Sequence, residues 1–584
     1  MTVLRLIGFS GETPRAQPRL LPAMGAQRAE NVRFTSGAVR PLRRSRLVRR
    51  FTEPLSGPIR SLHRHQGEWL AWSSLVQAVP GPVAQDRLYY TGDGVPQMRV
   101  NGQIYPLAVP RPMIGLTATL SGTASASTDA VTTRIYSFTW VTGFGEESAP
   151  AKASNEVAWK PGQSVTLSGF PAPPSGRAIT RQRLYRSQTS SSGVTSFNFI
   201  AEREASDASF IDQVAVDAFG EVLPSTDWTA PPPDLAGLIS LPNGMMAGFV
   251  DRDLYFCEPW RPHAWPEKYV LTTDYPIVAL GAFGSTLVVL TQGHPYLVTG
   301  TAPDSMAMER LDVNLPCINA RGVVDLGYGL AYPSHDGLVT VSASGPVLAS
   351  ASVLSAEQWR ALNPATLVAG RHEGLYVAAY EALDGQGVPE RGLILIDASA
   401  QGGFLSRASA QADAIFNDMA SSRLFLLDGL SVREFDAPGA PFETLRWRSR
   451  HFVLPLLEPA PAALLLQTVE LKSPAQMRQD EQARQAVIAR NRLALGSPLE
   501  GALDAQAFNV LPLQGDVLEQ TTQPIQAEAR LYADGRLIAS VRELNVIKRL
   551  PAGYRAQILE LEITGTATLA EVRLGSPDEI AQVS

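Results

Sequence analysis

The stretch TLVVLTQGHPYLVTG, residues 286–300, joins two apolar runs through a turn at Gly293. The same strand–turn–strand pattern returns further along the chain, with turn glycines at Gly337, Gly385 and Gly429, at intervals of 44, 48 and 44 residues. Strand pairs that recur about every 40 to 50 residues are typical of β-propeller blades, because each blade is a small sheet that must stack on its neighbours to bury its faces. The pattern predicts propeller blades over residues 233–440.

Composition supports a mainly β chain. The 584 residues include 47 Gly and 44 Pro, and short apolar runs lie between them. This pattern favours short strands joined by turns over long helices. A hydrophobic content of 45% is enough for several buried cores, so we expect more than one domain.

The segments on either side of the blades have their own patterns. Apolar and polar residues alternate in residues 59–110, which predicts the first propeller strands. They also alternate in the Ser/Thr-rich residues 111–232, which predicts an inserted immunoglobulin- or fibronectin-like β-sandwich. Residues 441–584 predict a C-terminal β domain that carries a helix at about 474–495. The predicted fold is a β-propeller with this inserted sandwich and this C-terminal domain.

Residues 1–58 are expected to form an extended, Arg-rich N-terminal arm, because they show no sustained helical or strand period. The first 60 residues carry a formal charge of about +9, whereas the whole chain carries −6. An Arg-rich arm without interleaved aromatic residues favours docking on an acidic partner over binding to nucleic acid bases. The candidate docking residues are Arg40, Arg43, Arg44, Arg46, Arg49 and Arg50.

The usual signatures of catalysis are missing from the sequence. It contains no motif of zinc proteases, P-loop proteins, dinucleotide-binding folds or nucleophile elbows, and we therefore expect no enzyme activity and no cofactor. His63 and His65 could lie on one face of a strand, but spacing assigns no third ligand, so no metal site is predicted. Cys257 and Cys317 are expected to be buried free thiols.

The segment LYFCEPWRPHAWPEKY, residues 254–269, is rich in proline and aromatic residues. Each proline pushes the residue before it towards extended geometry, which favours a rigid corner with packed rings over a sugar-stacking platform. The candidate corner residues are Trp260, Pro262, His263, Trp265 and Pro266.

Four stretches together resemble tail proteins of tailed bacteriophages, especially the nozzle protein, also called tail tubular protein B, of short-tailed phages. They are FSGETPRAQPRLLPAMGAQRAENVRFTSGAVRPLR (9–43), YSFTWVTGFGEESAPAKAS (136–154), LYFCEPWRPHAWPEKYVL (254–271) and IKRLPAGYRAQILELEITGTATLAEVRLGSPDEI (547–580). The family corner falls on Glu258 to Pro266 and the family loop on Gly143 to Pro150, and Cys257 stands where serine is common.

The resemblance implies a structural virion protein without catalytic residues. Such a protein forms a homohexameric ring below the tail adaptor, and genomic DNA passes transiently through the ring during ejection. Tail fibres or tip proteins are further possible partners. The implied location is the virion, after assembly in the host cytoplasm, and no apolar run is long enough to span a membrane.

Two alternatives remain open from the sequence. The first is a host-receptor or glycan-binding tail propeller, in which Trp260 and Trp265 would be exposed. The second is a propeller glycanase, whose carboxylates could come from different blades and leave no motif in the sequence.

Overall fold

The computed structural model describes residues 4–34, 37–52, 56–125, 131–189, 195–383, 387–399, 403–454, 462–467, 482, 485–490, 526–551 and 553–582. The described chain is mainly β, as the composition predicts. It divides into two compact units, Met1–Leu62 with Cys317–Ser584, called unit 1 here, and His63–Pro316, called unit 2. Each unit is described by itself below.

Unit 2 contains three four-stranded antiparallel sheets among its described residues, and in each sheet the neighbouring strands are consecutive in the chain. The first sheet contains β8 (Gln77–Pro80), β9 (Arg87–Thr91), β10 (Gln97–Val100) and β11 (Gln103–Pro106). The second contains β20 (Ala236–Ser240), β21 (Met246–Val250), β22 (Asp253–Phe256) and β23 (Leu271–Thr272). The third contains β24 (Ile277–Phe283), β25 (Thr286–Thr291), β26 (Tyr296–Thr299) and β27 (Ala307–Arg310). A strand pair, β6 (Ser61–His65) and β7 (Glu68–Trp72), precedes them.

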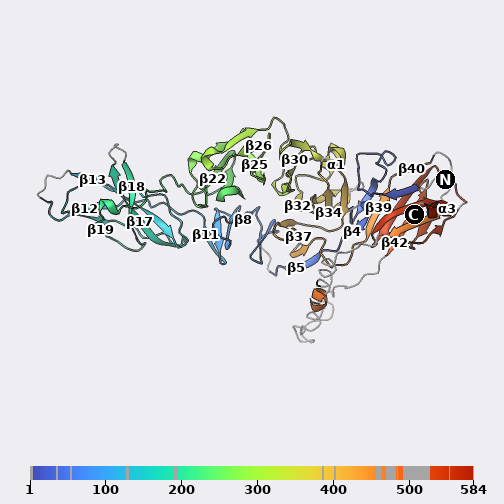
Figure 1. The fold of residues 1–584 in the computed structure, drawn as a ribbon, viewed down its shortest axis with the longest axis horizontal. Helices are drawn as coiled ribbons and strands as arrows, with labels where there is room; N and C mark the ends of the chain where they lie inside the picture. The colour runs from blue at the N-terminus through green and yellow to red at the C-terminus, as the bar shows by residue number, and fades with distance from the viewer. Residues whose placement is uncertain are drawn as a thin grey trace. The chain divides into compact units, whose positions relative to one another are not determined.

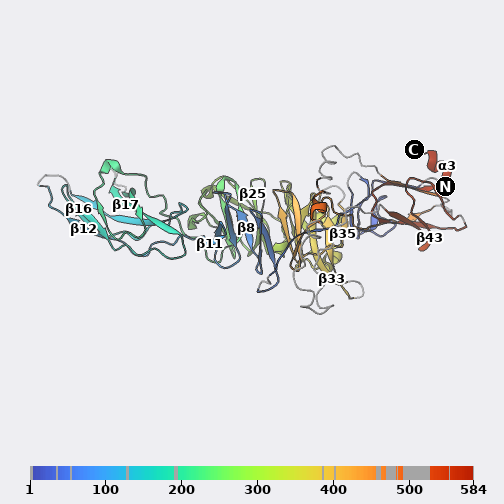
Figure 2. The same cartoon turned by 90° about the horizontal axis from the view of Figure 1, so that it is seen from below.

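The segment between the first two of these sheets forms smaller sheets around a core of its own, and Figure 2 shows β12, β16 and β17 grouped together in cyan. One sheet contains β12 (Thr117–Ser121), β16 (Ser164–Ser168) and β19 (Phe210–Asp212). Another contains β14 (Tyr136–Thr142), β17 (Ile179–Thr189) and β18 (Thr195–Glu204), and β13 (Thr132–Arg134) pairs with β15 (Val157–Trp159). The buried rings of Tyr136, Phe138 and Trp140 share this core with Val165 and Leu167.

Unit 1 continues the four-stranded pattern (Figure 1). One sheet contains β28 (Val324–Asp325), β29 (Leu330–Pro333), β30 (Leu338–Ser342) and β31 (Gly345–Leu348). The next four strands are β32 (Val368–His372), β33 (Leu375–Leu383), β34 (Pro389–Ile396) and β35 (Leu405–Ala408). The last set contains β36 (Ala414–Asp418), β37 (Arg423–Asp428) and β38 (Ser431–Glu434). The first strands β28, β32 and β36 lie side by side in this order.

The turn glycines occupy equivalent places in these sheets. Gly293 lies between β25 and β26, Gly337 between β29 and β30, and Gly429 between β37 and β38, which in each sheet is the connection of the second strand to the third. Gly385 lies outside the described residues, and the flanking strands are β33 and β34. The regular glycine interval therefore corresponds to a regular strand order.

The first fifty residues differ from the expected extended arm, because they supply strands to sheets of unit 1. These strands are β1 (Leu4–Ile7), β2 (Ala26–Glu30), β3 (Val32–Arg33), β4 (Arg40–Pro41) and β5 (Arg46–Arg50). β5 is the fourth strand beside β38, and β2 lies between β35 and β39 (Leu445–Ser449) in a ten-stranded sheet. The segment forms no core of its own, but strands from the end of the chain supply the apolar surface that it needs.

The C-terminal strands complete unit 1. The ten-stranded sheet runs from β39 to β45 (Ile558–Gly565), β42 (Ala527–Ala533) and β43 (Arg536–Val541), with β40 (Phe452–Val453) also on β45. A second sheet contains β1, β46 (Leu569–Gly575), β41 (Ala462–Gln467) and β44 (Lys548–Arg549). Trp447 is fully buried in their common core, and its indole Nε1 donates to the carbonyl of Ser10 at 3.0 Å.

Helices are few and short among the described residues. They are α1 (Ala356–Ala361), α3 (Pro577–Gln582) and the 3₁₀ turns η2 (Val216–Ala218), η3 (Pro242–Gly244), η4 (Glu267–Tyr269), η5 (Pro303–Ser305), η6 (Ala320–Gly322) and η7 (Ala349–Ser352). Of the helix predicted at about 474–495, Gln482 and residues 485–490 are helical, and the remaining positions lie outside the described residues.

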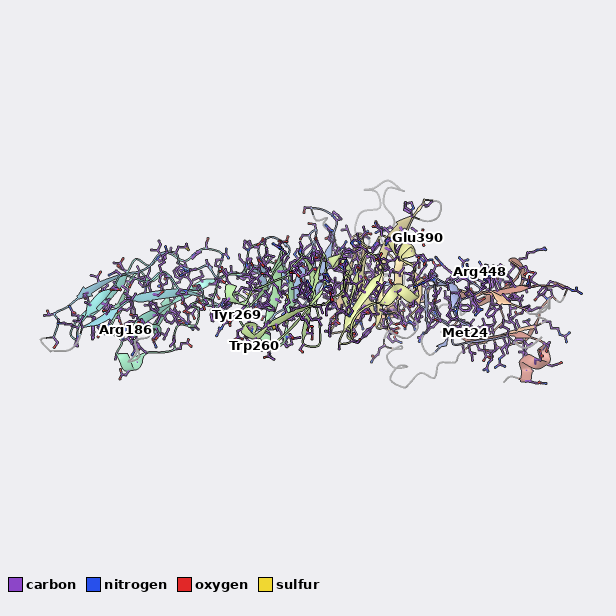
Figure 3. The ribbon with its side chains drawn as sticks, turned by 90° about the horizontal axis from the view of Figure 1, so that it is seen from above. Met24, Arg186, Trp260, Tyr269, Glu390 and Arg448 are labelled. Atoms are coloured by element: carbon purple, nitrogen blue, oxygen red, sulfur yellow. The ribbon has the colours of Figure 1, made fainter. Side chains whose placement is uncertain are left out.

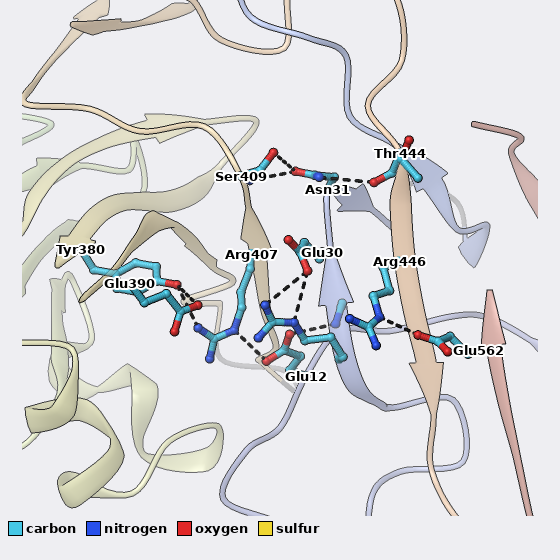
Figure 4. Close-up of polar contacts among 12 residues, drawn as sticks. Glu12, Glu30, Asn31, Tyr380, Glu390, Arg407, Ser409, Thr444, Arg446 and Glu562 are labelled. Carbon is cyan, nitrogen blue, oxygen red and sulfur yellow. Dashed lines mark hydrogen bonds and ion pairs between the residues drawn. The ribbon is translucent and has the colours of Figure 1, made fainter. Parts of the chain in front are cut away.

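Polar side chains hold β2 between its two neighbours, as Figure 4 shows. The buried Glu12 carboxylate accepts the backbone N–H of Ala29 (2.8 Å) and pairs with Arg407 of β35 (3.2 Å). On the other side of the same strand pair, the side-chain oxygen of Asn31 accepts the N–H of Ser409 (2.9 Å), and its amide donates to the carbonyl of Thr444 (3.3 Å). These contacts satisfy polar groups that burial would otherwise leave unpaired.

We expect Glu12→Ala to destabilise unit 1 by about 3 kcal/mol, because the substitution removes the carboxylate partner of the half-buried Arg407 and leaves the buried Ala29 N–H without its acceptor. Glu12→Gln keeps an acceptor for the N–H and should cost less. Urea unfolding followed by tryptophan fluorescence measures the difference, with the exposed Glu357→Ala as control. Equal stability of Glu12→Ala and the control would show that the contact does not hold β2 in place.

Candidate functional site: the proline-rich corner and its loop

Residues 257–266 form a compact corner directly after β22. The N–H groups of Glu258 and Arg261 donate to the carbonyls of Ala264 and Glu258, and the N–H of Ala264 donates back to the carbonyl of Arg261 (2.9 to 3.0 Å). Pro262 and Pro266 have fixed φ and no N–H, so they fit such a corner better than a continued strand. The corner is closed by its own backbone.

Trp265 fixes the corner through burial of its side chain and through two hydrogen bonds. Its side chain is fully buried in a cluster that also contains Tyr89, Met246 and Cys257. The indole Nε1 donates to the carbonyl of Pro262 (2.7 Å), and the backbone N–H donates to the carbonyl of Thr229 (2.8 Å). Trp265 is therefore a structural ring with its polar atom satisfied, and it offers no open face to a ligand.

His263 is also buried and makes the contact that links the corner to another part of unit 2. Its Nε2 donates to the backbone carbonyl of Glu147 at 3.1 Å, and its ring meets Trp228 edge to face at 5.7 Å. Burial, with the nearby Arg261 charge, lowers the pKa of His263 to about 3. The ring is therefore neutral at physiological pH, with the proton on Nε2, and it serves as a hydrogen-bond donor.

Glu147 belongs to the loop Gly143–Pro150, and its carboxylate is the centre of a buried network. Oε1 accepts the hydroxyls of Thr139 (2.7 Å) and Tyr185 (2.6 Å), while Oε2 pairs with Arg183 (3.0 Å). Ser137 and Thr139 are both buried, and this network and a neighbouring carbonyl satisfy their hydroxyl groups. The loop is thus held by paired polar groups on one side and by His263 on the other.

Glu146, the neighbouring residue, is buried with less support. Burial raises the pKa of its carboxyl to about 7, although Arg87 lies 3.7 Å away and Thr142 donates to it at 3.3 Å. Arg87 also stacks on the ring of Phe144 in the same loop, with 5.3 Å from its guanidinium to the ring centroid. The loop therefore contains one carboxyl that titrates near neutral pH.

Trp260 differs from the expected packed ring. Its side chain is 58% exposed and its φ is 61°, a backbone conformation that is rare for a large side chain. The ring lies against Gly244, where any Cβ would collide with it, and the Trp260 N–H donates to the carbonyl of Gly244 at 2.9 Å. Figure 3 labels Trp260. The corner therefore presents one fixed aromatic ring to solvent.

A hollow of about 510 Å³ lies beside the corner. Its wall contains Pro231, Pro232, Pro233, Tyr255, Trp265 and Glu267. Trp265 contributes little surface to this wall, because only 1% of that residue is exposed. The sequence does not predict this hollow, since its wall is assembled from two separate segments, residues 229–233 and 255–270.

The candidate docking arginines lie on strands or turns of unit 1 and divide into two sets. Arg43 donates to the carbonyl of Ala440 (2.8 Å) and stacks on Phe442, and Arg46 pairs with the buried Glu434, so both act within the chain. Arg40 lies on β4, where its backbone pairs with that of Arg33. Arg44, Arg49 and Arg50 are exposed; Arg44 lies 3.8 Å from the Glu443 carboxylate, and β5 carries the last two on a strand paired with β38. Docking of a partner on the exposed set stays a prediction.

Metal ligands were considered at His63 and His65. His65 is buried, and its Nε2 lies 3.4 Å from the carbonyl of Asp86. Within the described ranges, the group close enough to hold an ion is His372, Glu373 and Asp436, which sequence spacing had missed because the ligands are far apart in the chain. Arg33 pairs with both carboxylates there and His372 contacts Asp436 at 3.1 Å, so cationic or polar partners already occupy these atoms.

Both cysteines are free and buried, as predicted. Burial raises the pKa of each thiol to about 12, so neither is a ready thiolate. Among the helices of the described residues, none is long and apolar enough to cross a membrane.

No protein-family model matches the sequence, and no curated protein matches it. Solved structures match weakly. Hsv2 of Kluyvelomyces marxianus is 11% identical, with 49% of this chain and 71% of that chain covered and a TM-score of 0.22. The exo-beta-1,3-galactanase of Phanerochaete chrysosporium is 8% identical, with 70% and 100% covered and a TM-score of 0.21. The extracellular domain of the putative one component system BT4673 of B. thetaiotaomicron is 8% identical, with 92% and 62% covered and a TM-score of 0.24. Such low scores carry no argument about this chain.

We expect the stability of the protein to depend on Glu146 between about pH 4.5 and pH 7. Because the folded state raises this pKa, the carboxyl contributes most below its unfolded pKa, and its contribution is lost as the pH rises to about 7. The loss is on the order of 3 kcal/mol. Thermal unfolding of the native protein and of Glu146→Gln over this pH range measures it. The variant should show a flatter pH profile and higher stability at pH 7.5, and an unchanged profile would contradict the assignment.

Proposed function

We propose that this chain is a structural subunit of the tail nozzle of a short-tailed bacteriophage, part of a ring around the distal DNA-ejection channel. The observation that carries the proposal is where the four resembling stretches lie. In unit 1 the opening stretch pairs with the closing stretch, through Val39 and Leu569 and near the pairing of β1 with β46. In unit 2 the loop Gly143–Pro150 meets the corner at His263. The resemblance thus coincides with the contacts that join distant parts of the chain.

The same proposal includes the finer fold. We infer that each unit contributes sheets of the propeller-blade type, since each sheet is an antiparallel series of four strands and their first strands lie side by side. Residues 111–232 are then an inserted sandwich, because two sets of strands share one core. Residues 441–584 form the C-terminal β domain, with strands from the N-terminus added to it.

A conduit needs a stable wall more than it needs reactive groups. The corner supports such a role, because its buried groups are neutral or paired: His263 donates one hydrogen bond, Trp265 donates another, and Glu147 accepts three. Strands that are paired on both sides leave few open edges during assembly of a ring. The net charge of −6 would also avoid retarding DNA through attraction to its phosphates. We therefore propose a non-enzymatic role.

The partners follow from this role as part of the proposal. They are further copies of the chain in a homohexamer, a tail adaptor protein above the ring, and fibres or tip proteins beside it. The exposed residues Arg44, Arg49 and Arg50 are candidates for the adaptor contact. The protein would be assembled in the host cytoplasm and remain in the virion.

Electron microscopy of purified particles tests the proposal. We expect a six-fold ring at the distal end of the tail, decorated by an antibody against this chain, and absent from particles made without it. Light scattering of the purified protein adds a second measurement, in which hexamers or adaptor-dependent hexamers are expected. Particles that contain no copy of the chain would refute the role.

A second candidate, a glycan-binding propeller, is favoured by one observation. Trp260 presents an exposed ring on a rigid backbone next to Gly244, and an aromatic face of this kind can stack on a sugar. Trp265, which that function would also use, is buried. The arrangement therefore offers one stacking ring to a glycan.

Binding of the purified chain to a glycan array separates the two candidates. The glycan function predicts binding that Trp260→Ala abolishes and that Tyr328→Ala, at another exposed aromatic residue, leaves unchanged. The nozzle function predicts that neither variant changes binding and that Trp260→Ala particles retain their ring. Release of reducing ends from a polysaccharide by the purified protein would instead indicate the glycanase.

A further inference from the structure

A polar hollow of about 460 Å³ opens in unit 1 next to β33 and β34. It is separate from the corner, which lies in unit 2. Its charged and amide-bearing wall residues are Arg60, Arg321, Glu381, Arg391, Gln411 and Asp413. Its volume is in the range of pockets that hold small molecules.

Arg321 is a fixed member of this wall. Its Nη2 donates to the backbone carbonyls of Arg60 (3.0 Å) and Asp413, which hold the guanidinium in one place. Burial lowers the pKa of Arg321, and the charge of Arg60 adds to the effect. Two guanidinium groups therefore approach the same space, and each repels the other.

The carboxylates of the hollow are already used by a third arginine. Arg391 pairs with Glu381 (2.7 Å) and with Oδ1 of Asp413 (2.7 Å), and Oδ2 of Asp413 accepts the N–H of Gly429 (2.8 Å). In the described part of the chain, no carboxylate lies within ion-pair distance of Arg60 or Arg321. The hollow thus combines Arg391, which two carboxylates balance, with Arg60 and Arg321, and the Asp413 charge favours the charged form of Arg321 only through space.

Two guanidinium groups that share a space are suited to an oxyanion, since a guanidinium offers several planar N–H donors and stays charged. The rest of the wall suits hydroxyl groups. The Glu381 side chain is 61% exposed and can accept hydrogen bonds at the rim, and the Gln411 amide can accept or donate them.

We propose that this hollow binds an acidic saccharide, with the sugar carboxylate between Arg60 and Arg321 and the hydroxyls towards Glu381 and Gln411. The site goes beyond the nozzle role and does not depend on it, because binding of a monomer and assembly of a ring are measured separately. It is also distinct from the Trp260 surface, whose candidate ligand contact is the exposed Trp260 ring.

Isothermal titration of the full-length chain tests the site with three probes. These are an oligogalacturonate, a neutral galactose oligomer of the same length, and a single-stranded DNA oligonucleotide. We expect the oligogalacturonate to bind about ten- to hundredfold more tightly than the neutral oligomer. The exposed Arg60→Glu should lose most of this affinity, and Arg360→Ala, at an exposed arginine paired with Asp336, should keep it.

Arg321→Lys is the second variant, because it keeps the charge and removes the planar donors. It should weaken oligogalacturonate binding. Its unfolding midpoint shows whether the fold is intact. The proposal is overturned if the acidic and neutral oligomers bind equally, if no acidic oligomer binds at about 10 mM, or if Arg60→Glu binds as the native chain does. Tighter binding of the DNA than of the oligogalacturonate would overturn the ligand class.

Discussion

The structure of unit 1 depends on one constraint: its first fifty residues complete sheets whose other strands lie more than 330 residues later in the chain. β2 is inserted between β35 and β39, and β5 completes the sheet of β36, β37 and β38. An inserted strand must satisfy its polar neighbours on both sides, and the side chains of Glu12 and Asn31 do so. Such long-range pairing closes sheet edges that would otherwise invite aggregation.

Unit 2 also depends on contacts between segments that are far apart in the chain. A proline-rich corner and a loop more than a hundred residues earlier in the chain meet at the hydrogen bond between His263 and Glu147. The contact is stable because each buried group is neutral or paired, with Glu146 as the group that titrates near neutral pH. A protein that has to remain rigid while a polymer passes it gains from contacts of this kind. The proposed nozzle role requires such rigidity.

Local patterns predicted local structure well. The glycine interval predicted the strand order around Gly293, Gly337 and Gly429, and the prolines predicted the corner with Trp265 buried. Pairing between distant segments leaves no local signal, so the sequence predicts an arm where the structure has strands, and a docking role for Arg46, which pairs with Glu434. Exposure of Trp260 also could not be predicted, because it depends on a left-handed backbone and on Gly244 beneath the ring. The hollow around Arg321 is assembled from several segments, and no short motif could reveal it.

The central claim, that the N-terminal strands belong to the folded sheets, is tested most directly by hydrogen exchange of the full-length chain followed by mass spectrometry. Peptides that cover residues 26–33 should exchange as slowly as peptides from β39 and β45, and peptides that cover residues 46–50 as slowly as peptides from β38, since their amides share the same ladders. Exchange of both N-terminal peptides within seconds, while β39 and β45 stay protected, would contradict the account.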